Sequence, residues 1–131
     1  MSYDRTISLT SDFATTVDAV REALAAQGFG ILTAIDVTAT LKTKLGHDME
    51  DYLILGACNP PLAHRALEAD RTIGLLLPCN VVVRREGDHT LVQALDPNTV
   101  VTLTGLSALQ PVAQEAAARL DAALASLACP A

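Results

Sequence analysis

The sequence predicts an α+β fold, with a mainly antiparallel sheet and amphipathic helices packed on one side of it. Residues 3–10 alternate between two faces, which is typical of a half-buried strand. Two apolar runs flank residues 86–88, and this pattern predicts a β-hairpin. Residues 13–24 and 112–127 place apolar side chains three or four positions apart, as one face of a helix requires. The length fits one domain over residues 1–131.

In the first half of the chain, strands are expected to alternate with helices. Ser11 and Asp12 supply an N-terminus for the first helix, and Gly28 ends it. A second strand is expected over residues 29–37, followed by a short helix that ends at Gly46. The third strand, "YLILGAC", is apolar on both faces and is therefore predicted to lie inside the sheet.

The second half of the chain begins with a helix, "NPPLAHRALEAD", that starts at its prolines. The segment "IGLLLP" fits either a further turn or an apolar loop. After the hairpin, "NTVVTLTG" is expected to form a last short strand. Pro111 then opens a long terminal helix.

The composition favours a protein that pairs with a second copy of itself. Half of the residues are hydrophobic (50%) and only 18% are charged, so apolar surface is expected to remain for a second subunit to cover. Aromatic residues make up 3%, so the core must be built from aliphatic side chains. We therefore expect a homodimer.

Charge and hydropathy argue against two classes of partner. The formal net charge is −6 and no basic stripe is visible, so we expect no nucleic-acid binding. The longest apolar runs are too short to span a bilayer, and residues 1–10 lack the apolar centre of a signal peptide. We therefore expect no membrane partner and a cytoplasmic location, where Cys58, Cys79 and Cys129 would stay reduced.

Cys58 lies where the third strand ends and the next helix begins. Asn59 is a suitable N-cap, and Pro60 and Pro61 stand where a missing N–H costs nothing. The Asn59–Pro60 bond fits either the cis or the trans form. A thiol at this point meets the positive end of the helix dipole and unpaired N–H groups, which favour the thiolate. The position therefore suits a reactive or ligand-binding thiol.

Cys79 follows Pro78 at the start of the next strand. If the two strands pair antiparallel, Cys58 and Cys79 approach each other although 21 positions separate them. His64 is the nearest third candidate ligand, although it lies more than one turn inside its helix. Cys58, His64 and Cys79 are therefore a candidate metal site.

The segments "LKTKLG" and "DYLILGACNPPLAHRALEADRTIGLLLPCNVVV" resemble the DUF302 family, the TT1751-like proteins. The likeness spans nearly the whole chain and is strongest from Leu41 to Val83. It implies a β-α-β4-α domain of TBP-like topology, commonly a homodimer, and it carries no established function. The TBP-like label describes topology and not DNA binding. The resemblance also implies a set of signature positions of undefined role: Cys58, Asn59, Pro60, Pro61, His64, Pro78, Cys79 and Asn80.

Three interpretations of these positions stay open. In the first, the protein binds a small ligand or a metal ion at Cys58, Asn59, His64, Cys79 and Asn80. In the second, it is a thiol-based redox enzyme in which Cys58 is the nucleophile and Cys79 resolves it by forming a disulfide. In the third, both cysteines only pack in the interior of a structural or interaction module, as free cysteine often does. The residues identify no cofactor and do not decide whether the protein is an enzyme.

Overall fold

The computed structural model of the chain describes residues 3–128, which form five strands and five α-helices. The strands are β1 (Asp4–Leu9), β2 (Gly30–Asp36), β3 (Tyr52–Cys58), β4 (Cys79–Glu86) and β5 (His89–Leu95). The helices are α1 (Phe13–Ala26), α2 (Val37–Leu45), α3 (Pro60–Ala69), α4 (Asn98–Thr104) and α5 (Gln110–Ala128). Two 3₁₀ helices complete the fold, η1 (Arg71–Leu76) and η2 (Ser107–Leu109).

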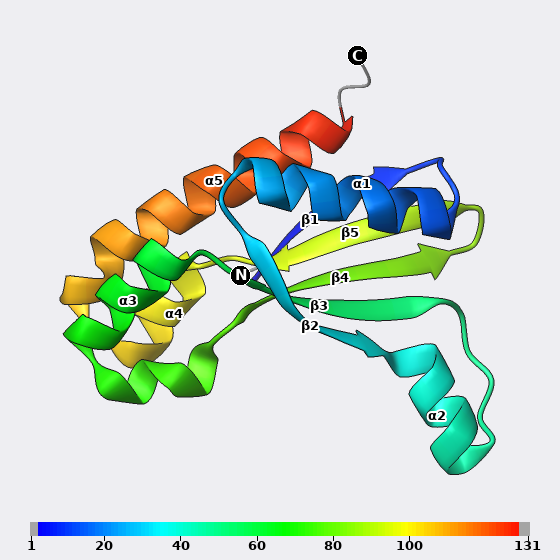
Figure 1. The fold of residues 1–131 in the computed structure, drawn as a ribbon, viewed down its shortest axis with the longest axis horizontal. Coiled ribbons are helices and arrows are strands. Elements are labelled where there is room, and N and C mark those ends of the chain that lie inside the picture. The colour runs from blue at the N-terminus through cyan, green and yellow to red at the C-terminus, as the bar shows by residue number, and fades with distance from the viewer. Residues whose placement is uncertain (1–2, 129–131) are drawn as a thin grey trace.

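The strands form one antiparallel sheet in the order β1-β5-β4-β3-β2. Figure 1 shows α1 and α5 side by side over the sheet, with α3 and α4 gathered at one end of the molecule and α2 projecting from the other. The predicted α+β class is confirmed. The β-α-β4-α order implied by the resemblance is also present as β1, α1, four further strands and α5, with α2, α3 and α4 inserted between them.

The helix starts and stops that the sequence predicts follow from local chemistry. Asp12 caps α1, because its carboxylate accepts a hydrogen bond from the Thr15 N–H at 2.8 Å. Gly28 follows that helix with a φ of 84°, in the left-handed region that glycine adopts without strain. The segment "IGLLLP", which fits a turn or a loop by its sequence, belongs mostly to η1.

The expectation of a short strand over "NTVVTLTG" is wrong, because this segment forms α4. Asp96 accounts for the difference: its side chain accepts a hydrogen bond from the Asn98 N–H at 3.0 Å, and its carbonyl accepts one from the Thr99 N–H at 2.9 Å. These bonds close a first turn and stabilise a helical start, and local capping overrides the strand preference of the valines and threonines. Gly105, with a φ of 70°, ends the helix.

The main core lies between the sheet and helices α1 and α5. Leu55, Val83 and Val92 from the strands are fully buried there against Val20 and Leu120 from the helices. Burying one such aliphatic side chain stabilises the fold by about 1.5–3 kcal/mol relative to leaving it exposed. The core is therefore mainly aliphatic, as the low aromatic content required, and Phe29 is its buried aromatic residue.

A second and smaller apolar cluster holds together the helical end formed by α3, η1, α4 and η2. Its buried members are Ala66, Ile73 and Leu109, and valines of α4 and α5 pack around them. Arg5 of β1 fixes this end to the sheet, because its guanidinium contacts Asp121 on α5 at 2.5 Å and Asp96 before α4 at 3.2 Å. The molecule thus contains two apolar clusters that meet at one end of the sheet.

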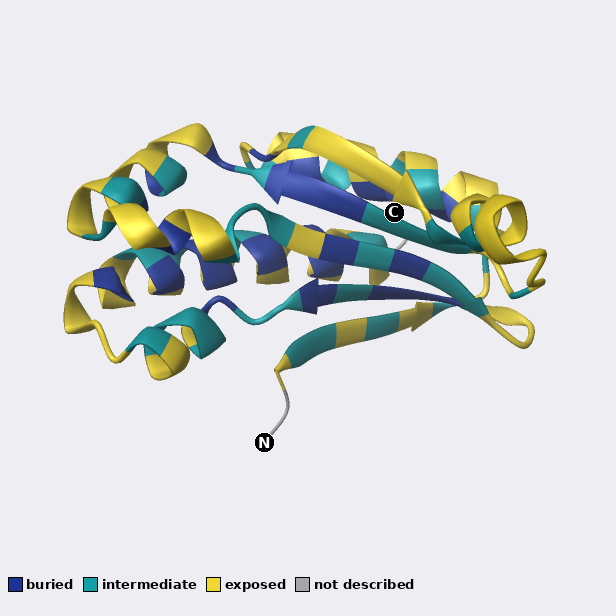
Figure 2. Cartoon of the chain, turned by 90° about the horizontal axis from the view of Figure 1, so that it is seen from below, coloured by how far each residue is buried: buried dark blue, intermediate teal, exposed yellow. Residues whose placement is uncertain are grey.

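The strand β2 and the helix α2 that follows it are poorly covered. Figure 2 shows β2 and α2 almost wholly exposed, whereas the inner strands carry most of the buried residues. Leu32 and Ile35 on β2 are 65% and 49% exposed, and Leu45 at the end of α2 is 74% exposed. None of the nine residues of α2, all within the described part of the chain, is buried.

Candidate functional site

The two cysteines lie at one end of the sheet, at the edge that faces the helical end. Strands β3 and β4 pair antiparallel, and Ala57 is the direct partner of Cys79 in this register. Cys58 is therefore diagonal to Cys79, so the predicted strand pairing brings the two positions close together. Neither cysteine takes part in a disulfide within residues 3–128, and Cys129 lies outside the described residues.

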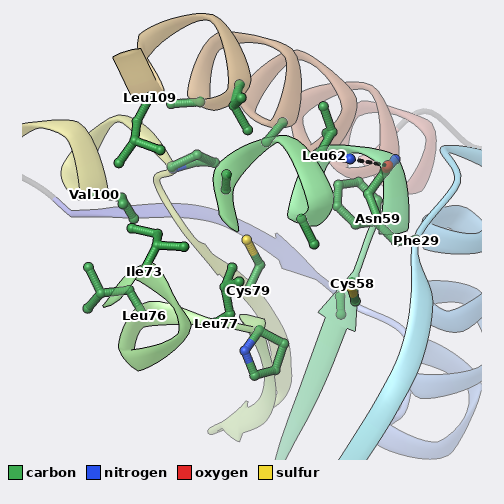
Figure 3. A pocket seen from close by; sticks show the side chains of 18 residues that line it. Phe29, Cys58, Asn59, Leu62, Ile73, Leu76, Leu77, Cys79, Val100 and Leu109 are labelled. Carbon is green, nitrogen blue, oxygen red and sulfur yellow. Dashed lines mark hydrogen bonds between the residues drawn. The ribbon is translucent and has the colours of Figure 1, made fainter. Parts of the chain in front are cut away.

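The side chains of the two cysteines nevertheless point to opposite faces of the sheet. Directly paired residues share a face, so Cys79 lies on the same face as the buried Ala57, and Cys58 one residue later turns to the other face. Figure 3 shows the Cys79 sulfur among the pocket side chains under α3, and Cys58 at the tip of β3. A disulfide between them would require the backbone to move, because its two Cβ atoms must converge.

Asn59 acts as the N-cap of α3. Its side-chain oxygen accepts a hydrogen bond from the Leu62 N–H at 3.3 Å (Figure 3). Pro60 and Pro61 carry no N–H, so the first turn of α3 offers Cys58 no unpaired N–H group. The expectation that free N–H groups stabilise a thiolate at Cys58 is therefore corrected. In this part of the chain the cis peptide bond joins Leu77 to Pro78 and not Asn59 to Pro60.

Cys79 is held as a neutral thiol. Burial raises the pKa of its thiol, and the nearby Cys58 raises it further, because a second negative charge there would repel the first. A protonated thiol is a weak nucleophile and a poor metal ligand. The environment of Cys79 therefore resembles an apolar interior more than a reactive site.

A small apolar cavity of about 80 Å³, partly open to the surface, lies beside Cys79 at the boundary between the two apolar clusters. Eighteen residues line it, from β3, α3, η1, β4, α4, η2, α5 and the segments between them (Figure 3). Phe29 and Ala57 belong to the main core, whereas Ile73 and Leu109 belong to the smaller cluster. The cavity is therefore a space that the two clusters leave between them.

Alanines explain why this space is not filled. Ala63 and Ala66 on α3 face Ala113 and Ala116 on α5, and all four line the cavity. Small side chains on two facing helices leave volume that larger aliphatic residues would occupy, and Phe29 is the one aromatic side chain that the described lining contains. The empty volume thus follows from the residue types of α3 and α5.

Salt bridges on the outer surface join the two alanine-bearing helices. Glu115 on α5 contacts Arg65 on α3 at 3.1 Å and Arg119 at 3.2 Å. Hydrogen bonds from these two arginines lower the pKa of Glu115, so its carboxylate stays charged at neutral pH. Arg119 also donates to the Gln27 carbonyl at 3.1 Å, which links α5 to the end of α1.

Two of the predicted site residues lie away from the cavity. His64 is exposed on α3, where Leu62 and Ala66 on the other side of the helix are buried, and Asn80 is exposed on β4. Neither belongs to the cavity lining drawn from the described residues. Within residues 3–128 no three His, Cys, Asp or Glu side chains gather as a metal ion requires, so the geometry gives the predicted set of Cys58, His64 and Cys79 no support.

Sequence reasoning missed most of the apolar walls of the cavity. Ile73, Val100, Leu109 and Val112 come from segments that are far apart in the chain, and each segment alone resembles ordinary core. A partial signal existed in the pairs of alanines spaced three residues apart on α3 and α5. Such pairs are common in helix packing, so the signal becomes specific only when the two helices are known to face each other.

Comparison with known proteins gives the family. The family profile described as "Domain of unknown function DUF302" matches residues 5–127. The chain belongs to the DUF302 family. A solved structure titled "Crystal structure of uncharacterized conserved protein DUF302 from Bacillus stearothermophilus" is 31% identical and superposes with a TM-score of 0.89, covering 95% of this chain and 97% of that one. A search of curated proteins finds no match.

The resemblance read from the residues is therefore confirmed for family and fold. The DUF302 description assigns no activity, so the function has to be argued from the site. The helices of this DUF302 domain, over residues 3–128, include none long and apolar enough to cross a membrane.

Proposed function

We propose that this DUF302 protein binds a small molecule in the cavity between the end of the sheet and helices α3 and α5. The observation that carries the proposal is the cavity itself, about 80 Å³ of unfilled apolar space at the junction of two well-packed clusters. Native interiors contain few voids larger than a water molecule, and an unfilled site loses packing contacts. A retained cavity with apolar walls is therefore a candidate ligand site.

Some residues around the cavity are free to contact a ligand, whereas others already make contacts that stabilise the fold. Cys58 and Cys79 border the cavity, with Cys79 as a neutral thiol. Asn59 borders it too, but its side-chain oxygen already serves as the cap of α3. In this proposal the Cys79 thiol contacts the ligand, Cys58 borders the cavity from the end of β3, and Asn59 keeps α3 in place above it.

The thiol enzyme is less well supported. That mechanism has Cys58 as the nucleophile and needs Cys79 to form a disulfide with it, whereas the strand register directs the two side chains to opposite faces. A raised pKa at Cys79 also keeps the thiolate scarce at neutral pH. A metal at Cys58, His64 and Cys79 and a cytoplasmic location stay predictions from the sequence.

The test is a ¹H–¹⁵N NMR screen of the full chain with a mixed set of neutral, anionic and cationic fragments. Binding in the cavity should shift the amide signals of lining residues such as Ile73, Val100 and Ala113. Ala63→Leu, which places a larger side chain in the cavity, should abolish those shifts. Ala69→Leu is the matched control, because Ala69 lies exposed on the same helix outside the lining.

Two results would refute the proposal. One is a screen in which no fragment shifts the lining residues of the wild-type chain. The other is a set of shifts that both leucine variants retain equally. Thermal unfolding of the two variants establishes that each is folded, and Ala63→Val is the smaller replacement if leucine at this position prevents folding.

We also propose that the protein forms a homodimer through β2 and α2. A nine-residue helix with no buried residue is marginal by itself in water, so α2 needs further contacts to be stable. Leu32, Ile35 and Leu45 expose apolar surface on this unit. Lys42 on α2 already pairs with Asp48 of the following loop at 2.8 Å, so the exposed apolar surface, and not charge, supports contact with a second copy.

A further inference from the structure

The proposed ligand site differs from most small-molecule sites in having no charged wall. Among the described residues that line the cavity there is no Asp, Glu, Lys, Arg or His. The nearest ion pairs of α3 and α5, Arg65–Glu115 and Arg119–Glu115, lie on the outer surface and satisfy one another. A charge inside the cavity would therefore lose its water without gaining a partner.

The polar groups that do reach the cavity are neutral and mostly occupied. The Asn59 side-chain oxygen accepts a hydrogen bond from the Leu62 N–H. Pro60 and Pro61 have no N–H, so the first turn of α3 has fewer backbone donors than an ordinary helix. The remaining polar groups among the described lining side chains are the Asn59 amide nitrogen, which can donate, and the thiols of Cys58 and Cys79, which are weak hydrogen-bonding groups. The walls thus favour a ligand that needs few hydrogen bonds.

The volume limits the size of the buried group. An apolar cavity of about 150 Å³ stays dry and accepts benzene, with six carbon atoms. On the same scale a cavity of about 80 Å³ fits an apolar group of about three or four carbon atoms. A larger ligand would have to leave its remaining atoms at the mouth.

We infer that the ligand is an uncharged apolar molecule, or the aliphatic end of a larger uncharged one, with a short hydrocarbon group held between α3 and α5. This inference rests on the proposed binding function and adds to it the chemical class of the ligand. The uncharged walls reject carboxylates and amines that lie inside the cavity, so the site selects by charge as well as by size.

The test compares xenon with three four-carbon probes of similar size on the full chain: butan-1-ol, butyrate and n-butylammonium. Saturable amide shifts at Ile73, Val100 and Ala113 should occur with the two uncharged probes. Butyrate and n-butylammonium should bind at least tenfold more weakly, because the charged group of each would lose water beside apolar walls that offer it no partner. Ala63→Leu should remove binding of the uncharged probes, and Ala69→Leu should leave it unchanged.

The possible failures separate the two claims. If butyrate or n-butylammonium binds at the lining residues as tightly as butan-1-ol, the inference about charge is overturned while the cavity remains a binding site. If polar or charged fragments from the mixed set bind there and the uncharged probes do not, the same conclusion follows. If no probe and no fragment shifts the lining residues, both the inference and the proposed function fail.

Discussion

At the scale of single residues, the most informative side chain is Cys79. Its raised pKa means that the folded chain holds the proton more tightly than the unfolded chain. The stability contributed by the neutral thiol is therefore fully present below the thiol's ordinary pKa of 9.0 and is lost as pH rises through the raised value.

Alkylation should therefore be slow at Cys79. In a Cys129→Ser background, iodoacetamide at pH 7.5 should modify Cys79 more slowly than the same thiol after unfolding, and its rate should still be rising above about pH 9, where the rate for the unfolded thiol levels off. Peptide mass spectrometry over a pH series measures this rate, and a Cys79→Ala variant identifies the signal. Modification of folded Cys79 at the unfolded rate near neutral pH would refute the neutral-thiol assignment and revive the redox mechanism.

Gly56 on β3 is a position where the neighbouring residues leave no space for a side chain. A Cβ atom at this buried position would overlap the Thr33 Oγ1 atom and would lie 2.9 Å from the Cγ atom of Pro78. Gly56→Ala should therefore destabilise the fold by about 1–3 kcal/mol, as overpacking does. Urea denaturation measures the loss.

The double variant Gly56→Ala with Thr33→Ala provides the control for that interpretation. Removing the threonine hydroxyl should recover part of the loss, and the contact with the rigid Pro78 ring should retain the rest. If Gly56→Ala is as stable as the wild-type chain, Thr33 and Pro78 do not pack closely against Gly56.

At the scale of elements, the start of α3 depends on Asn59. The side chain is 8% exposed and accepts the Leu62 N–H. Asn59→Ala should cost about 1 kcal/mol of unfolding free energy, and Asn59→Ser should recover most of it because serine also caps helices. Chemical denaturation of both variants distinguishes a capping role from a ligand-contacting one, since equal losses for serine and alanine would contradict capping.

At the scale of the whole molecule, β2 and α2 should determine the oligomeric state. Sedimentation at micromolar concentration should show a dimer. Ile35→Lys, at a 49% exposed position on β2, should shift it towards monomer without lowering the folded fraction. Leu103→Lys, at a 69% exposed position on α4, is the matched control and should remain dimeric. A wild-type chain that sediments as a monomer throughout this range would contradict the interface.

The sequence predicted those features that depend on neighbouring residues. The cap at Asp12, the start of α3 at Asn59 and its prolines, and the hairpin between β4 and β5 are all local, and all are confirmed. The exception is α4, where hydrogen bonds to the Asp96 side chain and to the Asp96 carbonyl outweigh the strand preference of the residues that follow.

Features that depend on register or on packing could not be predicted in this way. A one-residue offset decides whether Cys58 and Cys79 share a face, and periodicity alone does not fix that offset. The cavity requires α3 and α5 to face each other across their alanines, which follows only from the complete fold. His64 is close to Cys58 along the chain, whereas the helical rotation turns it to solvent.

The proposed ligand cavity between α3 and α5 can be examined without knowledge of the natural ligand, in a crystal structure determined under xenon pressure. Xenon binds dry apolar cavities and needs no hydrogen bond, so it reports the cavity whatever the natural ligand is. We predict a xenon atom between α3 and α5, near Cys79 and Ile73, in the wild-type chain and in Ala69→Leu, and none there in Ala63→Leu. A wild-type crystal with no xenon at this position, or with side chains closing the space, would contradict the proposed cavity.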